Sequence, residues 1–138
     1  MLQLTSVLLV DDDSTTNLLN QLLLHNMHVS EQVLTAENGQ EALDTLTQLQ
    51  AEHGPGVCPQ LIFLDLNMPV MNGISFLEAY QQANPCTCPS AIIVLANSLT
   101  EREAMRARRL PITGFLTKPL TREKITAVLL EHFPTLSL

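Results

Sequence analysis

The chain has 138 residues, of which 46% are hydrophobic, and this length suits one domain with its own core, so we expect a single domain over residues 1–138 without an output domain. The formal net charge is −7 and all seven Lys and Arg residues lie between Arg102 and Lys124, which argues against general nucleic-acid binding. The first apolar run has no basic residue before it and stops at Asp11, so we expect neither a signal peptide nor a membrane span, and a cytoplasmic location.

Short apolar runs indicate the strands of the fold. Four of them are continuous rather than alternating, at residues 7–10, 61–64, 92–95 and 112–116. Continuous apolarity is typical of parallel strands that are covered on both faces. Residues 33–35 form a weaker fifth run, which we expect near an edge of the sheet.

Helical spacing of apolar residues appears between these runs. The four stripes are Leu18, Leu19, Leu22 and Leu23; Ala42, Leu43, Leu46 and Leu49; Ile74, Leu77 and Tyr80; and Ile125, Val128 and Leu129. Residues 98–109 supply one further helix, and Thr121 is the candidate N-cap of the last one. Strand and helix therefore alternate five times, which predicts an α/β fold with a doubly wound, five-stranded parallel sheet and right-handed crossovers.

Carboxylates follow two of the predicted strands. Asp11, Asp12 and Asp13 come directly after the first strand and Asp65 comes after the third, while Lys118 ends the fifth. In an open parallel sheet, ligands bind outside the carboxyl ends of the strands, near the point where the strand order reverses. Grouped carboxylates repel one another, so this pattern predicts a hard divalent cation, Mg²⁺, at that edge. Asp13 also competes with the next residue, a serine, for the N-cap of the first helix.

Three segments carry a family resemblance. VLLVDDDS, LIFLDLNMPVMNG and GFLTKPL resemble the motifs of the receiver domain of bacterial two-component response regulators, and in order they span nearly the whole chain. The resemblance implies a flavodoxin-like fold and a phosphoacceptor module rather than an enzyme. It also implies a phosphoryl donor, either a sensor histidine kinase or a histidine phosphotransferase. Output would pass by onward phosphotransfer or by docking at the fourth helix and fifth strand.

The resemblance assigns roles to the acidic residues. Asp65 would accept the phosphoryl group and bind the metal, Asp12 would be a direct Mg²⁺ ligand, and Asp11 would act through water. Asn67 would offer its backbone carbonyl to the metal. These roles agree with the chemistry, because a carboxylate that attacks a phosphoryl group needs a cation to neutralise both partners.

The resemblance also assigns the cation and the switch residues. Lys118 would contact the phosphoryl group, and the peptide bond before Pro119 would be cis. Receiver domains usually carry Thr or Ser at the end of the fourth strand, where this chain has Ala96, with Ser98 close enough in sequence to compensate. Phe115 takes the place of the partner aromatic. Ala96 keeps open an alternative, a receiver-fold module that binds proteins with impaired phosphorylation switching.

A second alternative is a phosphatase of the haloacid-dehalogenase type. The run of residues 11–15 fits its D-x-D-x-T pattern, with Asp11 as the nucleophile and Asp13 as the general acid. That family needs an acidic pair after its lysine, whereas this chain offers only the separated Glu123 and Glu131. Asp65 would also have no role, so the receiver interpretation is favoured.

Overall fold

The computed structural model describes residues 4–54, 59–65, 73–83, 91–96 and 112–133. The strands are β1 (Leu4–Val10), β2 (Ser30–Ala36), β3 (Leu61–Asp65), β4 (Ala91–Ala96) and β5 (Gly114–Thr117). The helices are α1 (Ser14–Asn26), α2 (Gly39–His53), α3 (Gly73–Ala83) and α5 (Arg122–His132). The helix expected at residues 98–109 lies outside the described residues.

The five strands form one parallel sheet in the order β2-β1-β3-β4-β5. This order confirms the doubly wound α/β prediction, including the edge position of the weakest apolar run, which is β2. The chain moves outward from β1 to β2 and then returns across β1 to β3. The order therefore reverses beside β1, and the carboxyl ends of β1 and β3 flank the crevice where such sheets bind ligands.

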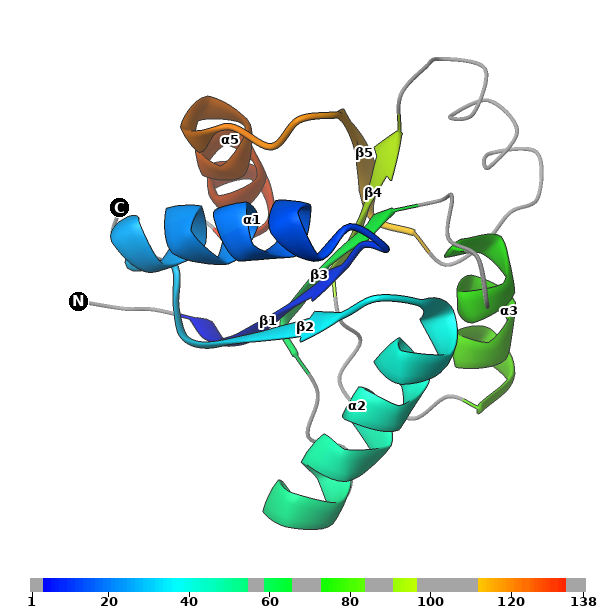
Figure 1. Cartoon of the computed structure of the whole chain (residues 1–138). Coiled ribbons are helices and arrows are strands. Elements are labelled where there is room, and N and C mark those ends of the chain that lie inside the picture. The colour runs from blue at the N-terminus through cyan, green and yellow to red at the C-terminus, as the bar shows by residue number, and fades with distance from the viewer. Residues whose placement is uncertain (1–3, 55–58, 66–72, 84–90, 97–111, 134–138) are drawn as a thin grey trace.

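Helices cover both faces of the sheet, with α1 and α5 on one side and α2 and α3 on the other (Figure 1). Successive residues of a strand point to opposite faces. Leu8 and Val10 accordingly enter the core under α2 and α3, and Val7 and Leu9 enter the core under α1 and α5. This use of both faces explains why the central strands are continuously apolar.

The predicted apolar stripe of the first helix is wrong. Leu18, Leu19 and Leu22 are 54%, 60% and 49% exposed, whereas the buried residues of α1 are Asn17, Asn20 and Leu24. The helix is therefore rotated so that most of its leucines face outward. Leu23 is the one member of the stripe that packs against the core.

Hydrogen bonds explain this rotation. The amide Nδ2 of Asn17 donates to the backbone carbonyls of Asp11, at 3.0 Å, and of Ala36, at 3.2 Å. These carbonyls lie at the carboxyl ends of β1 and β2, where buried acceptors need donors. The hydrophobic pattern predicts only which side of a helix is most apolar. Here the hydrogen bonds of Asn17 decide which side faces the sheet.

Side chains cap the helices at both ends of the described chain. Asp13 is the N-cap of α1 and accepts a hydrogen bond from the backbone N–H of Thr15, so the cap is Asp13 rather than Ser14. Thr121 caps α5 as predicted. Among the described residues no helix is long and apolar enough to cross a membrane. The cytoplasmic location and the single-domain organisation stay predictions.

Candidate functional site

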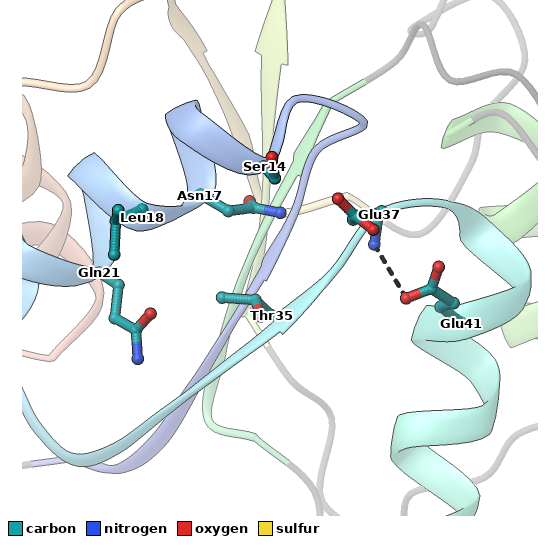
Figure 2. Close-up of a pocket in the computed structure, with 7 residues that line it drawn as sticks. All are labelled: Ser14, Asn17, Leu18, Gln21, Thr35, Glu37 and Glu41. Atoms are coloured by element: carbon teal, nitrogen blue, oxygen red, sulfur yellow. Dashed lines mark hydrogen bonds between the residues drawn. The ribbon is translucent and has the colours of Figure 1, made fainter.

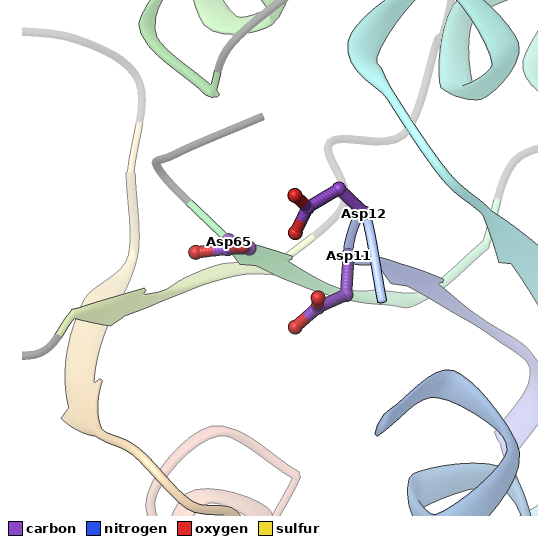
Figure 3. A group of neighbouring side chains, drawn as sticks. All are labelled: Asp11, Asp12 and Asp65. Carbon is purple, nitrogen blue, oxygen red and sulfur yellow. The ribbon is translucent and has the colours of Figure 1, made fainter. Parts of the chain in front are cut away.

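Three carboxylates meet at the carboxyl edge of the sheet (Figure 3). Asp11 and Asp12 follow β1, and Asp65 is the last residue of the neighbouring strand β3. One oxygen from each carboxylate can be chosen such that all three lie within 4.8 Å of one another. Asp11 and Asp65 are only 4% and 2% exposed, whereas Asp12 is exposed. The cluster therefore has a buried floor and one solvent-facing member.

Strand register and local hydrogen bonds hold Asp11 in place. Val10 lies opposite Leu64 in the β1–β3 ladder, so the residues that follow them reach the same level of the sheet. The Asp11 N–H donates to the Ala36 carbonyl at 3.0 Å, and its carboxylate Oδ1 accepts from the Asp13 N–H at 3.0 Å. The buried carboxylate is thus oriented before any ligand arrives.

Lys118 brings a cation to the acids. It directly follows β5, which pairs with β4, which in turn pairs with β3. Its Nζ lies 2.8 Å from Asp65 Oδ1 and 3.7 Å from Asp11 Oδ2. The peptide bond between Lys118 and Pro119 is cis, as predicted. The predicted association of these three strand ends is therefore observed.

The donor set fits a divalent cation. Asp11 Oδ2 is buried and accepts no hydrogen bond from the residues that the structure describes. An unsatisfied buried carboxylate oxygen is costly, and a bound cation is one way to satisfy it. Among the residues that the structure describes, three carboxylates also face a single ammonium group, that of Lys118. Carboxylate oxygens with an excess of negative charge are the ligands that Mg²⁺ prefers.

Burial and neighbouring charges shift the pKa values of Asp11 and Lys118. Burial raises the pKa of Asp11, and the negative charges of Asp65 and Asp12 add to this, against the Asp13 N–H and the charge of Lys118. Burial alone would lower the pKa of Lys118, but its hydrogen bond to Asp65 and the surrounding negative charges raise it instead. Lys118 is therefore a permanent cation at neutral pH.

Comparison with known proteins identifies the family. A family model for the response regulator receiver domain matches residues 7–130. The chain belongs to this receiver family. It is similar to a probable chemotaxis protein CheY from Rhizobium etli, with 34% identity over 123 residues that cover 89% of this chain and 88% of that one. The solved structure of a two-component response regulator from Cytophaga hutchinsonii gives a TM-score of 0.80 at 29% identity, covering 94% of this chain and 97% of that one.

Receiver domains also occur as parts of larger proteins. A protein-glutamate methylesterase/protein-glutamine glutaminase from Methanococcoides burtonii is 30% identical over 124 residues, which are 88% of this chain but 32% of that protein. The chain thus spans about a third of that relative's length. The matched part is a receiver domain, a phosphoacceptor of two-component systems rather than an enzyme in its own right. Such domains bind Mg²⁺ in an acidic pocket and interact with histidine kinases or phosphotransfer proteins.

The position of Asp13 argues against the phosphatase alternative. Its carboxylate caps α1 and accepts hydrogen bonds from the Thr15 N–H and the Thr16 hydroxyl, at 3.0 Å and 3.1 Å. The bond from the Thr16 side chain, followed by that from the Thr15 backbone, lowers the pKa of Asp13. A general acid needs a raised pKa to carry a proton at neutral pH. The receiver domain therefore uses Asp13 for its fold rather than for chemistry.

The remaining predicted site residues are only partly described. Asn67 and Ser98 lie outside the described residues. Ala96 is the last residue of β4, and its Cα lies opposite that of Thr117 in β5. Phe115 is partly buried and packs against the core under α2 and α3. The switch assignments stay predictions.

Sequence reasoning missed two residues that support the site. Asn17 donates a hydrogen bond to the backbone carbonyl of Asp11, and Lys124 donates to the backbone carbonyls on both sides of Lys118. Asn17 carried no signal, because it ends a run of polar residues before the apolar stripe, where surface residues are usual. Lys124 carried a weak one, since a lysine is unfavourable in the first turn of a helix.

We expect Asp11→Asn to raise the melting temperature of the metal-free receiver domain at neutral pH. The raised pKa means that the native state holds this proton more tightly than the unfolded chain, so stability falls as the pH rises from 3.8 through the raised pKa. Asparagine keeps the shape and the acceptor for the Asp13 N–H but removes the charge. Thermal melts in a chelator measure the effect.

The gain from Asp11→Asn should shrink as the pH is lowered toward 3.8, where the parent carboxylate also becomes neutral. Asp12→Asn is the matched control, because Asp12 is exposed and its charge is better solvated. We expect it to change the metal-free melting temperature less. A lower melting temperature for Asp11→Asn in the chelator would show that attraction to Lys118 outweighs burial.

Proposed function

We propose that Asp65 of this receiver domain accepts a phosphoryl group from a phosphohistidine of a sensor kinase or histidine phosphotransferase. The observation that carries the proposal is the 2.8 Å contact between Asp65 Oδ1 and Lys118 Nζ, inside a cluster that also holds Asp11 and Asp12. Asp11, Asp12, Asp65 and the backbone carbonyl of Asn67 would bind Mg²⁺. The matched family model supports this assignment.

The chemistry is a substitution at phosphorus. A carboxylate oxygen of Asp65 forms the new P–O bond as the P–N bond of phosphohistidine breaks, and the electron pair of that bond returns to the imidazole nitrogen. The product is an acyl phosphate. Bound Mg²⁺ supplies positive charge that offsets the negative charge of the carboxylate and the phosphoryl group.

Lys118 contributes a second positive charge. Its raised pKa keeps the ammonium group charged at neutral pH, so it acts by attraction and not as a base. In the absence of phosphate it pairs with Asp65 Oδ1. After transfer we expect the same ammonium group to contact an equatorial oxygen of the phosphoryl group.

We expect Asp65→Asn to abolish Mg²⁺-dependent phosphorylation, because asparagine keeps the shape of the side chain but lacks the nucleophilic charge. Incubation with Mg²⁺ and a small phosphodonor, followed by mass spectrometry of intact protein and peptides, locates the acid-labile phosphate. Asp13→Asn is the matched control, since asparagine is an equally good N-cap and Asp13 takes no part in the transfer. Phosphate on Asp11 would instead support the hydrolase mechanism.

The outer surface of α1 bears on partner binding. The outward face of this helix carries Leu18, Leu19 and Leu22, all about half exposed. Leu18 also lines a hollow of about 190 Å³ between α1, β2 and the start of α2 (Figure 2). Two carboxylates, Glu37 and Glu41, line the same hollow. The outer side of α1 thus combines exposed leucines with a hollow that two carboxylates line.

Charge complementarity defines the occupant that fits this surface. No Lys or Arg occurs before Arg102, so the segments that form α1, β2 and α2 carry only acidic charges. The hollow further contains Asn17, whose buried Oδ1 accepts no hydrogen bond from the described residues. We propose that the phosphodonor protein docks here with a helix that presents apolar side chains flanked by Lys or Arg.

The double substitution Leu19→Ser/Leu22→Ser should weaken docking of a phosphorylated histidine phosphotransferase that transfers to the parent chain. Removing two apolar contacts at the centre of an interface predicts about tenfold weaker binding, or about 1.4 kcal/mol. Transfer from a small phosphodonor should be unchanged. Leu130→Ser on α5 is the matched control, because Leu130 is 59% exposed and Leu19 is 60% exposed. Equal losses for the two variants would contradict the docking proposal.

Ala96 bears on the response to phosphorylation. A hydroxyl at this position would hydrogen-bond the phosphoryl group, and alanine cannot. A missing hydrogen bond to a charged oxygen is worth about 1.5–3 kcal/mol, which reduces a population shift by a factor of roughly ten or more. We therefore propose that phosphorylation moves residues 97–99 and the ring of Phe115 only weakly, unless Ser98 supplies the hydroxyl.

Ala96→Thr should enlarge the response to beryllofluoride, a mimic of the phosphoryl group. Amide chemical shifts of residues 97–99 and ring signals of Phe115, recorded with and without the mimic, measure the shift in population. The parent should show a small change although the mimic binds at Asp65. A full response in the parent would mean that another donor, such as Ser98, has replaced the missing hydroxyl.

A further inference from the structure

Lys124 donates hydrogen bonds to the residues on both sides of Lys118. Its Nζ donates to the Thr117 carbonyl at 2.7 Å, to the Thr117 hydroxyl at 3.2 Å and to the Pro119 carbonyl at 3.1 Å. An ammonium group has three protons, so these acceptors use its full donor capacity. The two carbonyls belong to the residues immediately before and after Lys118. The backbone from which Lys118 projects is thus fixed on both sides.

Within the part of the chain that the structure describes, few other backbone hydrogen bonds hold the connection from β5 to α5. β5 is the last strand of the sheet and pairs only with β4, whose partner residues end at the Ala96–Thr117 register. Pro119 has no N–H to donate. Polar carbonyls here need donors from elsewhere, and among the described residues Lys124 provides them for the carbonyls of Thr117 and Pro119.

The position of Lys124 in α5 is unfavourable for the helix itself. Thr121 is the N-cap and accepts a hydrogen bond from the Lys124 N–H at 3.2 Å, which makes Lys124 the third helical residue. At this position after a Thr cap, Glu or Gln would complete a capping box. A cation in the first turn is also opposed by the helix dipole. Helix stability therefore does not explain the lysine, whereas the three contacts to the connection do.

We infer that Lys124 is a positioning residue for Lys118. The Nζ of Lys118 lies at the end of a long side chain. Its 2.8 Å contact with Asp65 therefore depends on the position of the Lys118 backbone. Lys124 fixes the position of this backbone. It therefore acts on the phosphoryl group through Lys118, without contacting the phosphoryl group itself. The inference rests on the proposed role of Lys118 in phosphoryl transfer.

Lys124→Met in the full chain should lower the rate constant of phosphorylation at saturating acetyl phosphate and Mg²⁺ by about tenfold, since small errors in placement slow reactions strongly. The dissociation constant for Mg²⁺ should stay unchanged, because Lys124 binds no carboxylate of the cluster. The amide signal of Lys118 should shift. Lys124→Arg, which can still donate to both carbonyls, should restore most of the rate.

Arg122→Met is the matched control. It removes the same charge from the same turn of α5, and Arg122 is exposed. We expect its phosphorylation rate to match that of the parent. A loss equal to that of Lys124→Met would mean that only the charge near the site matters, and the inference would be overturned. If Lys124→Met does not fold, Lys124→Gln, which donates fewer hydrogen bonds, takes its place.

A double-mutant cycle separates action through Lys118 from direct action. In a Lys118→Met background, Lys124→Met should have no further effect on the rate, because the group that it positions is gone. An equal effect in both backgrounds would refute the inference. If the parent itself takes no phosphate, the proposed function fails, and the amide shift of Lys118 still tests the positioning role by itself.

Discussion

The ion pair between Lys118 and the buried carboxylates is the constraint on which the site depends. Asp11 and Asp65 are almost fully buried, and burial alone penalises their charged forms. The ammonium group of Lys118, the one cation at the site within the described parts of the chain, lies close to both of them but cannot balance three acids. The native receiver domain thus retains unsatisfied negative charge, including an Asp11 oxygen without a hydrogen bond from the described residues. The two apolar cores stabilise the fold enough to tolerate this unfavourable charge. The uncompensated carboxylates in turn favour binding of a divalent cation at the edge of the sheet.

Helices on one face of the sheet hold the strand ends that form this site. On α1, Asn17 binds the carbonyls of Asp11 and Ala36, and on α5, Lys124 binds the two carbonyls that flank Lys118. Both helices lie on the same face (Figure 1). The backbone at Asp11 and the backbone around Lys118 are therefore each fixed by a polar side chain from a neighbouring helix. Because the ties are made to backbone atoms, they place the functional side chains without competing for their charged groups.

The tie made by Asn17 also links the site to the outer surface. Since Asn17 must face the sheet, the opposite side of α1 turns its leucines to solvent. Exposed apolar patches that polar residues surround are typical of protein interaction sites. The same rotation that fixes the backbone of Asp11 thus creates the surface on which we propose that the phosphodonor docks. The hydrogen bonds of Asn17 thus have two consequences: they position the site, and they expose the leucines of the proposed docking surface.

The sequence by itself determined the strands, their parallel arrangement, the association of Asp11, Asp12, Asp65 and Lys118, and the cap at Thr121. These follow from local patterns, because continuous apolar runs, strand-end acids and capping residues each act within a few positions of the chain. Only the tertiary structure decided the rotation of α1, the burial of Asp11 but not of Asp12, and the contacts of Lys124. Periodicity measures how apolar an arc of a helix is, whereas these features depend on carbonyls and charges from other strands. Hydrogen bonds to backbone acceptors distant in the chain leave no hydrophobic pattern, so only the folded arrangement of β1, β2 and β5 reveals them.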